Sequence, residues 1–161
     1  MTPTTPFARV RPATVLDAGP LAEAHRTAWW ETYGEVVPAE AHPEPAESAR
    51  GWWEAALSDP DGPTTWVAVR DGAVVGFSRA VAPGAGNVRP LELQLLYVLA
   101  AEQGRRTGTH LLQMAVGDAP CALWVAAHDL RAQGFFRHHG FGLDGTREQR
   151  WGGLTVARML R

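Results

Sequence analysis

Residues 91–109 read LELQLLYVLAAEQGRRTGT, and this stretch decides how the rest of the chain is interpreted. Residues 91–98 have the apolar density of a buried strand, whereas the apolar residues after Gly108 follow helical spacing. The Gly- and Arg-rich turn between them therefore lies at a helix N-terminus, where free N–H groups and the helix dipole favour an anion. The turn predicts a diphosphate site. A tight strand-to-helix turn with two solvated arginines is the alternative.

This turn matches neither of the two best-known nucleotide-binding loops. A Walker loop needs a Gly-Lys-Ser/Thr segment, and the sequence contains no lysine. A dinucleotide fingerprint needs three glycines at G-x-G-x-x-G spacing, which Gly104 and Gly108 do not supply. A different phosphate-containing ligand is therefore expected.

Composition narrows the class of protein. The 161 residues are 45% hydrophobic and 20% charged, which predicts one globular domain over residues 1–161. The net charge of −2 gives no basic footprint for nucleic acid. No apolar run approaches the ~20 residues of a membrane span, and the N-terminus has no apolar leader. Cys121 is the only cysteine. We expect a cytoplasmic protein with no metal, nucleic-acid or membrane partner, in which Cys121 is a buried thiol.

Periodicity and turn chemistry predict alternating strands and helices. The strongest local signal is Asp71-Gly72, which predicts a hairpin. Trp66 and Trp124 lie inside predicted strands and are expected in the core. The expected elements, in chain order, are a strand (8–12), a helix (about 17–29) with Asp17 as N-cap, a proline-rich loop or helix entry (37–48), a helix through Trp52, Trp53 and Leu57, two strands (64–69 and 73–82), the strand 91–98, the helix after Gly108, a strand (122–126), a helix (about 129–138) and two strands (141–146 and 154–160).

Three segments together resemble the GNAT superfamily of N-acetyltransferases. The segment QGRRTG (103–108) resembles the family's acetyl-CoA loop, Q/R-x-x-G-x-G/A, and DLRAQGFFRHHGF (129–141) resembles its N-x-x-A-x-x-F-Y-x-x-x-G-F segment. The segments 10–14, 29–33 and 71–76 resemble the N-terminal half of small bacterial members. The resemblance covers nearly the whole chain. It implies an α/β fold with a mixed, mostly antiparallel sheet of about seven strands, flanked by helices and splayed between strands 4 and 5.

The resemblance also implies acetyl-CoA as co-substrate. The pantetheine arm would bind the unpaired backbone of residues 96–98 as an added strand does, and the diphosphate would bind the turn. Two residues depart from the family pattern: Arg106 replaces the first glycine, and Asp129 replaces the usual asparagine and acts either as an N-cap or as a cofactor contact. The residues expected to bind acetyl-CoA are Leu96, Tyr97, Val98, Gln103, Gly104, Arg105, Arg106, Thr107, Gly108, Thr109, Asp129 and Phe136.

Acetyl transfer to an amine needs a base and benefits from an acid. Glu92 is the only ionisable residue between Pro90 and Leu96, and we predict it as the base, acting through water; a solvated carboxylate at the strand edge is the alternative. Alternation places Glu92 and Gln94 on one face of the strand, with Leu91, Leu93 and Leu95 on the other. Where the family usually has a catalytic tyrosine, this chain has Phe136. Tyr97, His138 and His139 are the available helpers, and we predict Tyr97 as the catalytic one. A packing aromatic is the alternative for Tyr97, and His138 and His139 are expected at the surface in the last turn of their helix.

The region where the family binds its acceptor combines aromatic and acidic residues, which favours a cationic amine with flat or apolar parts. We therefore expect N-acetylation of a primary amine of a small molecule, such as an antibiotic or biosynthetic intermediate. The alternatives are a protein or peptide amine as acceptor, and an acyl-CoA-binding sensor with little catalysis. A homodimer is left open. The residues expected to bind the acceptor are Trp29, Trp30, Glu31 and Tyr33.

Overall fold

The structure is a computed structural model that describes residues 7–41 and 46–161, with the side chains of 46–48 left out. Within these residues, seven strands form one sheet in the order β1-β2-β3-β4-β5-β7-β6. All neighbours are antiparallel except β4 and β5, which are parallel. This confirms the mixed, mostly antiparallel sheet. The strands are β1 (Arg9–Pro12), β2 (Thr65–Arg70), β3 (Ala73–Val81), β4 (Leu91–Val98), β5 (Cys121–Ala126), β6 (Gly142–Arg150) and β7 (Leu154–Leu160).

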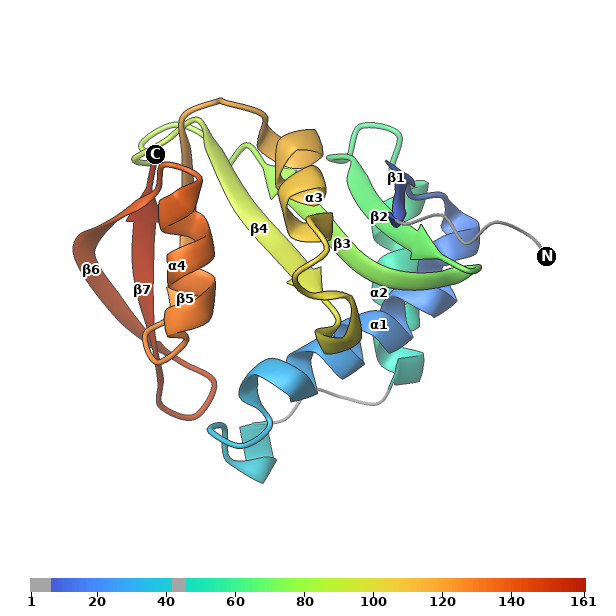
Figure 1. Ribbon diagram of the computed structural model, residues 1–161, viewed down its shortest axis with the longest axis horizontal. Coiled ribbons are helices and arrows are strands. Elements are labelled where there is room, and N and C mark those ends of the chain that lie inside the picture. The colour runs from blue at the N-terminus through green and yellow to red at the C-terminus, as the bar shows by residue number, and fades with distance from the viewer. Residues whose placement is uncertain (1–6, 42–45) are drawn as a thin grey trace.

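Helices cover both faces of the sheet (Figure 1). Helices α1 (Ala18–Tyr33) and α2 (Ala46–Ser58) pack on one face, and α3 (Thr107–Val116) and α4 (Leu130–His138) pack on the other. Part of the predicted loop 37–48, residues 42–45, lies outside the described residues. No helix in the described part of the chain is long and apolar enough to cross a membrane.

Local turn chemistry is confirmed at the β2–β3 hairpin. Asp71 and Gly72 have φ angles of 50° and 80°, the left-handed pair that a two-residue hairpin turn requires. Asp17 precedes α1 as predicted, but its side chain does not cap that helix. A 3₁₀ turn (Val15–Asp17) leads directly into α1. The Asp17 carboxylate therefore points towards the residues that precede it, and it accepts from the Thr14 N–H (2.8 Å) and from Arg11 (2.8 Å).

Strand β4 separates from β5 after a short paired segment. Only residues 91–93 of β4 pair with β5, opposite residues 121–123, and Figure 1 shows the two strands diverging beyond this point. The predicted splay is therefore confirmed. It leaves the second half of β4 without a strand on its β5 side.

A register shift in β4 overturns one prediction about its faces. The pairing of β3 with β4 slips between Arg79 and Ala80, opposite Leu95 and Leu93. Before the slip, Leu93 packs in the core cluster beside α3 and α4; after it, Leu95 packs in the cluster beside α1 and α2. The prediction that Leu91, Leu93 and Leu95 share one face is wrong, because the irregularity breaks the two-residue period.

Strand β6 continues to Arg150, well beyond the predicted end near residue 146. Nearly all of its residues are exposed, so no alternating apolar pattern marks the extension. Its pairing with β7 shifts between Leu143 and Arg147, where Gly145 has a φ of 87°.

Candidate active site

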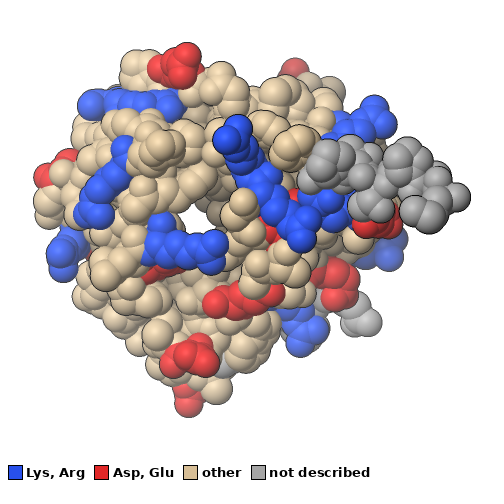
Figure 2. All heavy atoms as spheres, viewed as in Figure 1, with Lys and Arg blue, Asp and Glu red and all other residues tan. Residues whose placement is uncertain are grey.

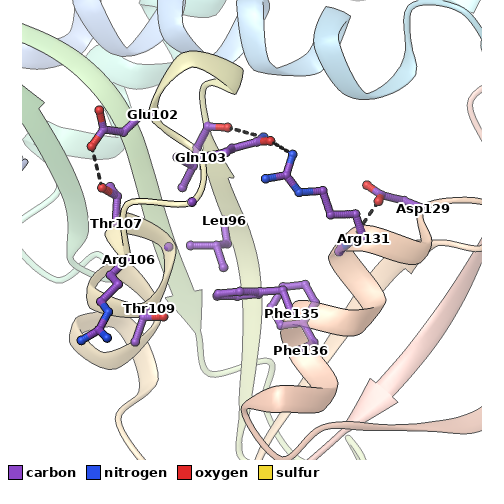
Figure 3. Close-up of a pocket in the computed structure, with 14 residues that line it drawn as sticks. Leu96, Glu102, Gln103, Arg106, Thr107, Thr109, Asp129, Arg131, Phe135 and Phe136 are labelled. Carbon is purple, nitrogen blue, oxygen red and sulfur yellow. Dashed lines mark hydrogen bonds between the residues drawn. The ribbon is translucent and has the colours of Figure 1, made fainter.

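The splay opens a cavity between α4 and the turn before α3. This larger cavity has a volume of about 380 Å³ (Figure 3). A smaller cavity of about 160 Å³ reaches residues of α1 and β5. The two share lining residues, and Figure 2 shows an opening in the middle of this face of the molecule. The shared residues are Leu96, Val98, Gln103, Asp129, Ala132 and Phe136.

The turn before α3 places unbonded N–H groups at the larger cavity. The first bond within α3 runs from the His110 N–H to the Arg106 carbonyl (3.1 Å), so the N–H groups of Thr107, Gly108 and Thr109 precede the intrahelical ladder. All three residues line the larger cavity. The predicted helix N-terminus therefore lies at the larger cavity; its binding of an anion stays a prediction.

Two residues of the turn adopt left-handed backbone. Gly104 has a φ of 80°, and Arg106, the N-cap of α3, has a φ of 64°. Such a conformation is strained for Arg106 because it carries a Cβ atom. Arg106 stands at the position where the resembling family has glycine, and the chain keeps the glycine-like backbone there. Its side chain lies beside the cavity (Figure 3).

Gly108 lies where a side chain would enter the larger cavity. A Cβ atom there would lie 3.4 Å from the Phe135 ring and 3.7 Å from Cγ2 of Val98. Glycine therefore keeps the space between α3, β4 and α4 open.

Gln103 connects the two sides of the cavity. Its amide nitrogen donates to the Val98 carbonyl (3.0 Å), and its amide oxygen accepts from Arg131 of α4 (Figure 3). Arg131 lines the larger cavity but was not identified from the sequence, where it resembles any solvated helix residue.

Asp129 caps helix α4. Its carboxylate accepts from the Ala132 N–H at 2.9 Å, which is the N-cap alternative considered from the sequence. Asp129 also lines both cavities.

Glu102 is a buried carboxylate that sequence reasoning missed. It is 3% exposed and accepts two hydrogen bonds from Arg70 of β2 (2.6 and 2.7 Å) and one from the Thr107 hydroxyl (2.9 Å). The bonds from Arg70 are the main reason that the pKa of the Glu102 carboxyl lies below its usual range. No local signal reveals this pairing, because the two residues lie on separate segments.

The open side of β4 offers backbone groups to a ligand. The Leu99 N–H donates to the Val75 carbonyl of β3 (2.9 Å). The Val98 carbonyl belongs to the same peptide group and therefore points the other way, towards the splay. Leu96 and Val98 line both cavities.

A pair of tyrosines lines the smaller cavity. Tyr97 of β4 and Tyr33 of α1 both border the space, and each side chain influences the pKa of the other. Burial raises the pKa of Tyr33 and raises that of Tyr97 well above its usual range. Both hydroxyls therefore keep their protons at neutral pH.

Phe136 forms a wall between the two cavities. It is 8% exposed, packs in the core cluster that contains Phe141, and has no hydroxyl to offer. His138 is exposed, and His139 lies 3.2 Å from the Thr109 hydroxyl through Nε2. Neither histidine lines either of these two cavities.

Glu92 lies at the start of β4, between Val81 of β3 and Ala122 of β5. It lines neither cavity, whereas Gln94 and Tyr97 further along β4 line the smaller one. Its assignment as the base stays a prediction.

Of the four predicted acceptor residues, one lines the smaller cavity and three line neither cavity. Tyr33 lines the smaller cavity, and the ring of buried Trp29 packs against the Tyr33 ring at a tilt of 56°, with ring centres 5.5 Å apart. Trp30 is 43% exposed, and the Glu31 carboxylate accepts from the Ala100 N–H (2.9 Å). Trp124, expected in the core, is only half-buried and lines the smaller cavity.

Arg150 lies over the Trp124 ring, at 4.8 Å from its centre. Arg105 of the turn is exposed and lines neither cavity. Within residues 7–41 and 46–161, no group of three His, Cys, Asp or Glu side chains is placed to hold a metal ion.

Comparison with known proteins identifies the family. The model of the acetyltransferase (GNAT) family matches residues 22–141. The chain belongs to this family. No curated protein is significantly similar in sequence.

Solved structures share the fold over nearly the full length. A ribosomal-protein-alanine N-acetyltransferase from Brucella melitensis is 24% identical, with a TM-score of 0.74 over 95% of this chain and 98% of that chain. The putative acetyltransferase yncA from Salmonella typhimurium, solved with acetyl-CoA, is 17% identical, with a TM-score of 0.72 over 96% and 92%. The paia N-acetyltransferase from Thermoplasma acidophilum, in complex with coenzyme A, is 19% identical, with a TM-score of 0.65 over 93% and 96%.

Proposed function

We propose that the protein transfers an acetyl group from acetyl-CoA to a primary amine of a small molecule. The observation that carries this proposal is the pair of connected cavities in the splayed sheet, with free helix N–H groups at one and a tyrosine pair at the other. Membership of the GNAT family and two solved relatives that hold coenzyme A or acetyl-CoA support the choice of co-substrate.

The residues of the larger cavity fit this co-substrate. The N–H groups of residues 107–109 would bind the diphosphate, and Arg106 would add positive charge. The open backbone of residues 96–98 would bind the pantetheine arm as an added strand does. The Gln103 amide nitrogen already donates to the Val98 carbonyl. A pantetheine amide that donates to the same carbonyl would therefore displace the Gln103 side chain. Acetyl-CoA would supply a thioester whose carbonyl carbon an amine can attack.

The chain's own groups handle the charge and the protons of this reaction. Backbone N–H groups of Leu96 and Val98 would donate to the thioester oxygen as it gains charge. Glu92 would take the amine proton through water as the N–C bond forms. The tyrosine pair, Tyr97 with Tyr33, would give a proton to the sulfur as the C–S bond breaks, in place of the hydroxyl that Phe136 lacks.

The smaller cavity supports a small, cationic acceptor. Its volume of about 160 Å³ suits the amine-bearing end of a compact molecule. The aromatic rings of Tyr33, Tyr97 and Trp124 and the carboxylate of Asp129 border it. Aromatic faces and a carboxylate both attract an ammonium group.

Binding and turnover test the proposal separately. Calorimetry with acetyl-CoA should show one site per chain, and a panel of small amines, with peptides added, should release the coenzyme A thiol with at least one small amine. Acetyl-CoA binding without thiol release from any amine would support the acyl-CoA sensor instead. Release only with peptides would overturn the small-molecule acceptor, and absence of binding would overturn the whole proposal.

A further inference from the structure

Arg70, Glu102 and Thr107, of which only Thr107 belongs to the QGRRTG segment, join the two ends of the phosphate turn (residues 103–106) to each other and to the sheet. Glu102 immediately precedes the turn and Thr107 immediately follows it, and the Thr107 hydroxyl donates to Oε1 of Glu102 at 2.9 Å (Figure 3). Residues 103–106 therefore form a loop whose ends are joined by a side-chain hydrogen bond. All the left-handed residues of the turn, Gly104 and Arg106, lie inside this loop.

The joined ends are fixed to the sheet by a buried ion pair. Nη2 of Arg70 donates to the same Oε1 of Glu102 (2.6 Å), and Nε donates to Oε2 (2.7 Å). The Arg70 and Glu102 side chains are 15% and 4% exposed. Arg70 is the last residue of β2, next to the tight Asp71-Gly72 hairpin, so the ion pair attaches the turn to the sheet. Bidentate geometry of this kind also fixes orientation.

The backbone strain at Arg106 gives a physical reason for the hydrogen bond between Thr107 and Glu102. A residue with a Cβ atom resists the left-handed region, so a turn with Arg106 has an intrinsic tendency to relax. Relaxation would move the N–H groups of Thr107 and Gly108 away from the larger cavity. A bond from Thr107 to a fixed carboxylate opposes this movement.

We propose that Arg70, Glu102 and Thr107 are positioning residues that hold the phosphate turn in its binding conformation and thereby set the affinity for acetyl-CoA. This inference rests on the proposed function, because it assumes that the turn binds the diphosphate of that co-substrate. The three residues act on binding rather than on the bond-making step. Their loss lowers the fraction of molecules with a competent turn, and the apparent Kd rises by the inverse of that fraction.

Thr107→Val is the sharpest test, because it keeps the size and branching of the side chain and the Arg70–Glu102 pair while removing the hydroxyl. We expect its Kd for coenzyme A, measured by calorimetry, to rise about tenfold, which corresponds to about 1.4 kcal/mol. In assays with a reactive amine, the KM for acetyl-CoA should rise while kcat at saturation stays near the wild-type value. Thr107→Ser restores a hydroxyl and should restore most of the affinity.

Glu102→Gln tests the anchor, with Asp17→Asn as a matched control. Asp17 is another buried carboxylate held by two bonds from one arginine, Arg11, but it lies before α1 and away from the cavities. Both variants should melt at a lower temperature than the wild type, and only Glu102→Gln should weaken coenzyme A binding.

The outcomes separate the clamp, which consists of Arg70, Glu102 and Thr107, from the proposed function. If the wild type binds coenzyme A and Thr107→Val binds equally well, the clamp is refuted while the proposed function stands. If Asp17→Asn weakens binding as much as Glu102→Gln, the effect is general destabilisation and the positioning role is refuted. If the wild type binds no coenzyme A, the proposed function itself has failed.

Discussion

Replacing Arg106 by glycine and by alanine tests the conformation of the phosphate turn. Arg106 has φ 64° and ψ 5°, a left-handed backbone that costs a residue with a Cβ atom about 1 to 2 kcal/mol. Glycine avoids this cost but loses up to about 1 kcal/mol through the greater freedom of the unfolded chain. The free energy of unfolding of Arg106→Gly should therefore exceed that of Arg106→Ala by up to about 1 kcal/mol. For a chain of this size, about 1 kcal/mol corresponds to a difference of about 2 to 4 °C in Tm.

Arg105 provides the control for this comparison. It is the exposed neighbour in the same turn, and its φ is not positive. Arg105→Gly should therefore be less stable than Arg105→Ala, the reverse of the order at position 106. Thermal melts of the four variants, monitored by circular dichroism, decide the matter. If Arg106→Gly is less stable than Arg106→Ala by the same margin as at position 105, the left-handed turn is refuted, and with it the strain that the clamp opposes.

Four further predictions concern the cavities and the core. Gly108→Asp would add a Cβ atom 3.4 Å from the Phe135 ring and a carboxylate beside the diphosphate site. Because like charges at an interface cost several kcal/mol, coenzyme A affinity measured by calorimetry should fall about 100-fold. Unchanged affinity would mean that the turn does not bind the diphosphate. Glu92→Gln should lower kcat/KM at neutral pH and lose less at high pH, where the amine needs no base; a pH profile that overlays the wild type would make Glu92 structural. Phe136→Tyr should leave kcat equal or raise it, by up to about 100-fold if thiolate departure limits the rate. A buried hydroxyl without a partner would instead cost about 1 to 3 kcal/mol, so kcat and Tm are measured together, and a stable variant with much lower activity would contradict both accounts. Burial lowers the pKa of His25 below its usual 6.5, so the unfolded chain binds the proton more readily. The free energy of unfolding should then fall as pH drops through 6.5 and level off below the folded-state pKa. His139, whose pKa is lowered in the same direction, adds to this slope, so His25→Leu should reduce it in urea melts at pH 5.5 and 7.5 without abolishing it.

Local chemistry made most of the fold predictable. Asp71-Gly72 predicts its hairpin because few residue pairs accept two consecutive left-handed conformations. The apolar strand before Gly104 and the helical spacing after Gly108 place the phosphate turn, because both patterns come from neighbours in the sequence. Asp129 was correctly considered as an N-cap on the same grounds, since capping needs only the next three residues.

Contacts between distant segments were not predictable in this way. Leu95 was assigned to the wrong face because the register slip opposite Arg79 is a property of the paired strands and not of β4 alone. Arg70 and Glu102 each look like solvated charges in the sequence. They become a buried pair only because the end of β2 lies beside the turn after β4.

The tyrosine pair shows why the splay matters for chemistry as well as for binding. Phe136 of α4 and Tyr33 of α1 come from opposite faces of the sheet, and in an unbroken sheet β4 and β5 would separate them. Because β4 leaves β5 after residue 93, both side chains border the smaller cavity together with Tyr97. A hydroxyl absent from one wall can therefore be supplied from the other. Under the proposed mechanism, an acetyltransferase of this fold can lose the tyrosine of α4 and keep a proton donor within the same cavity.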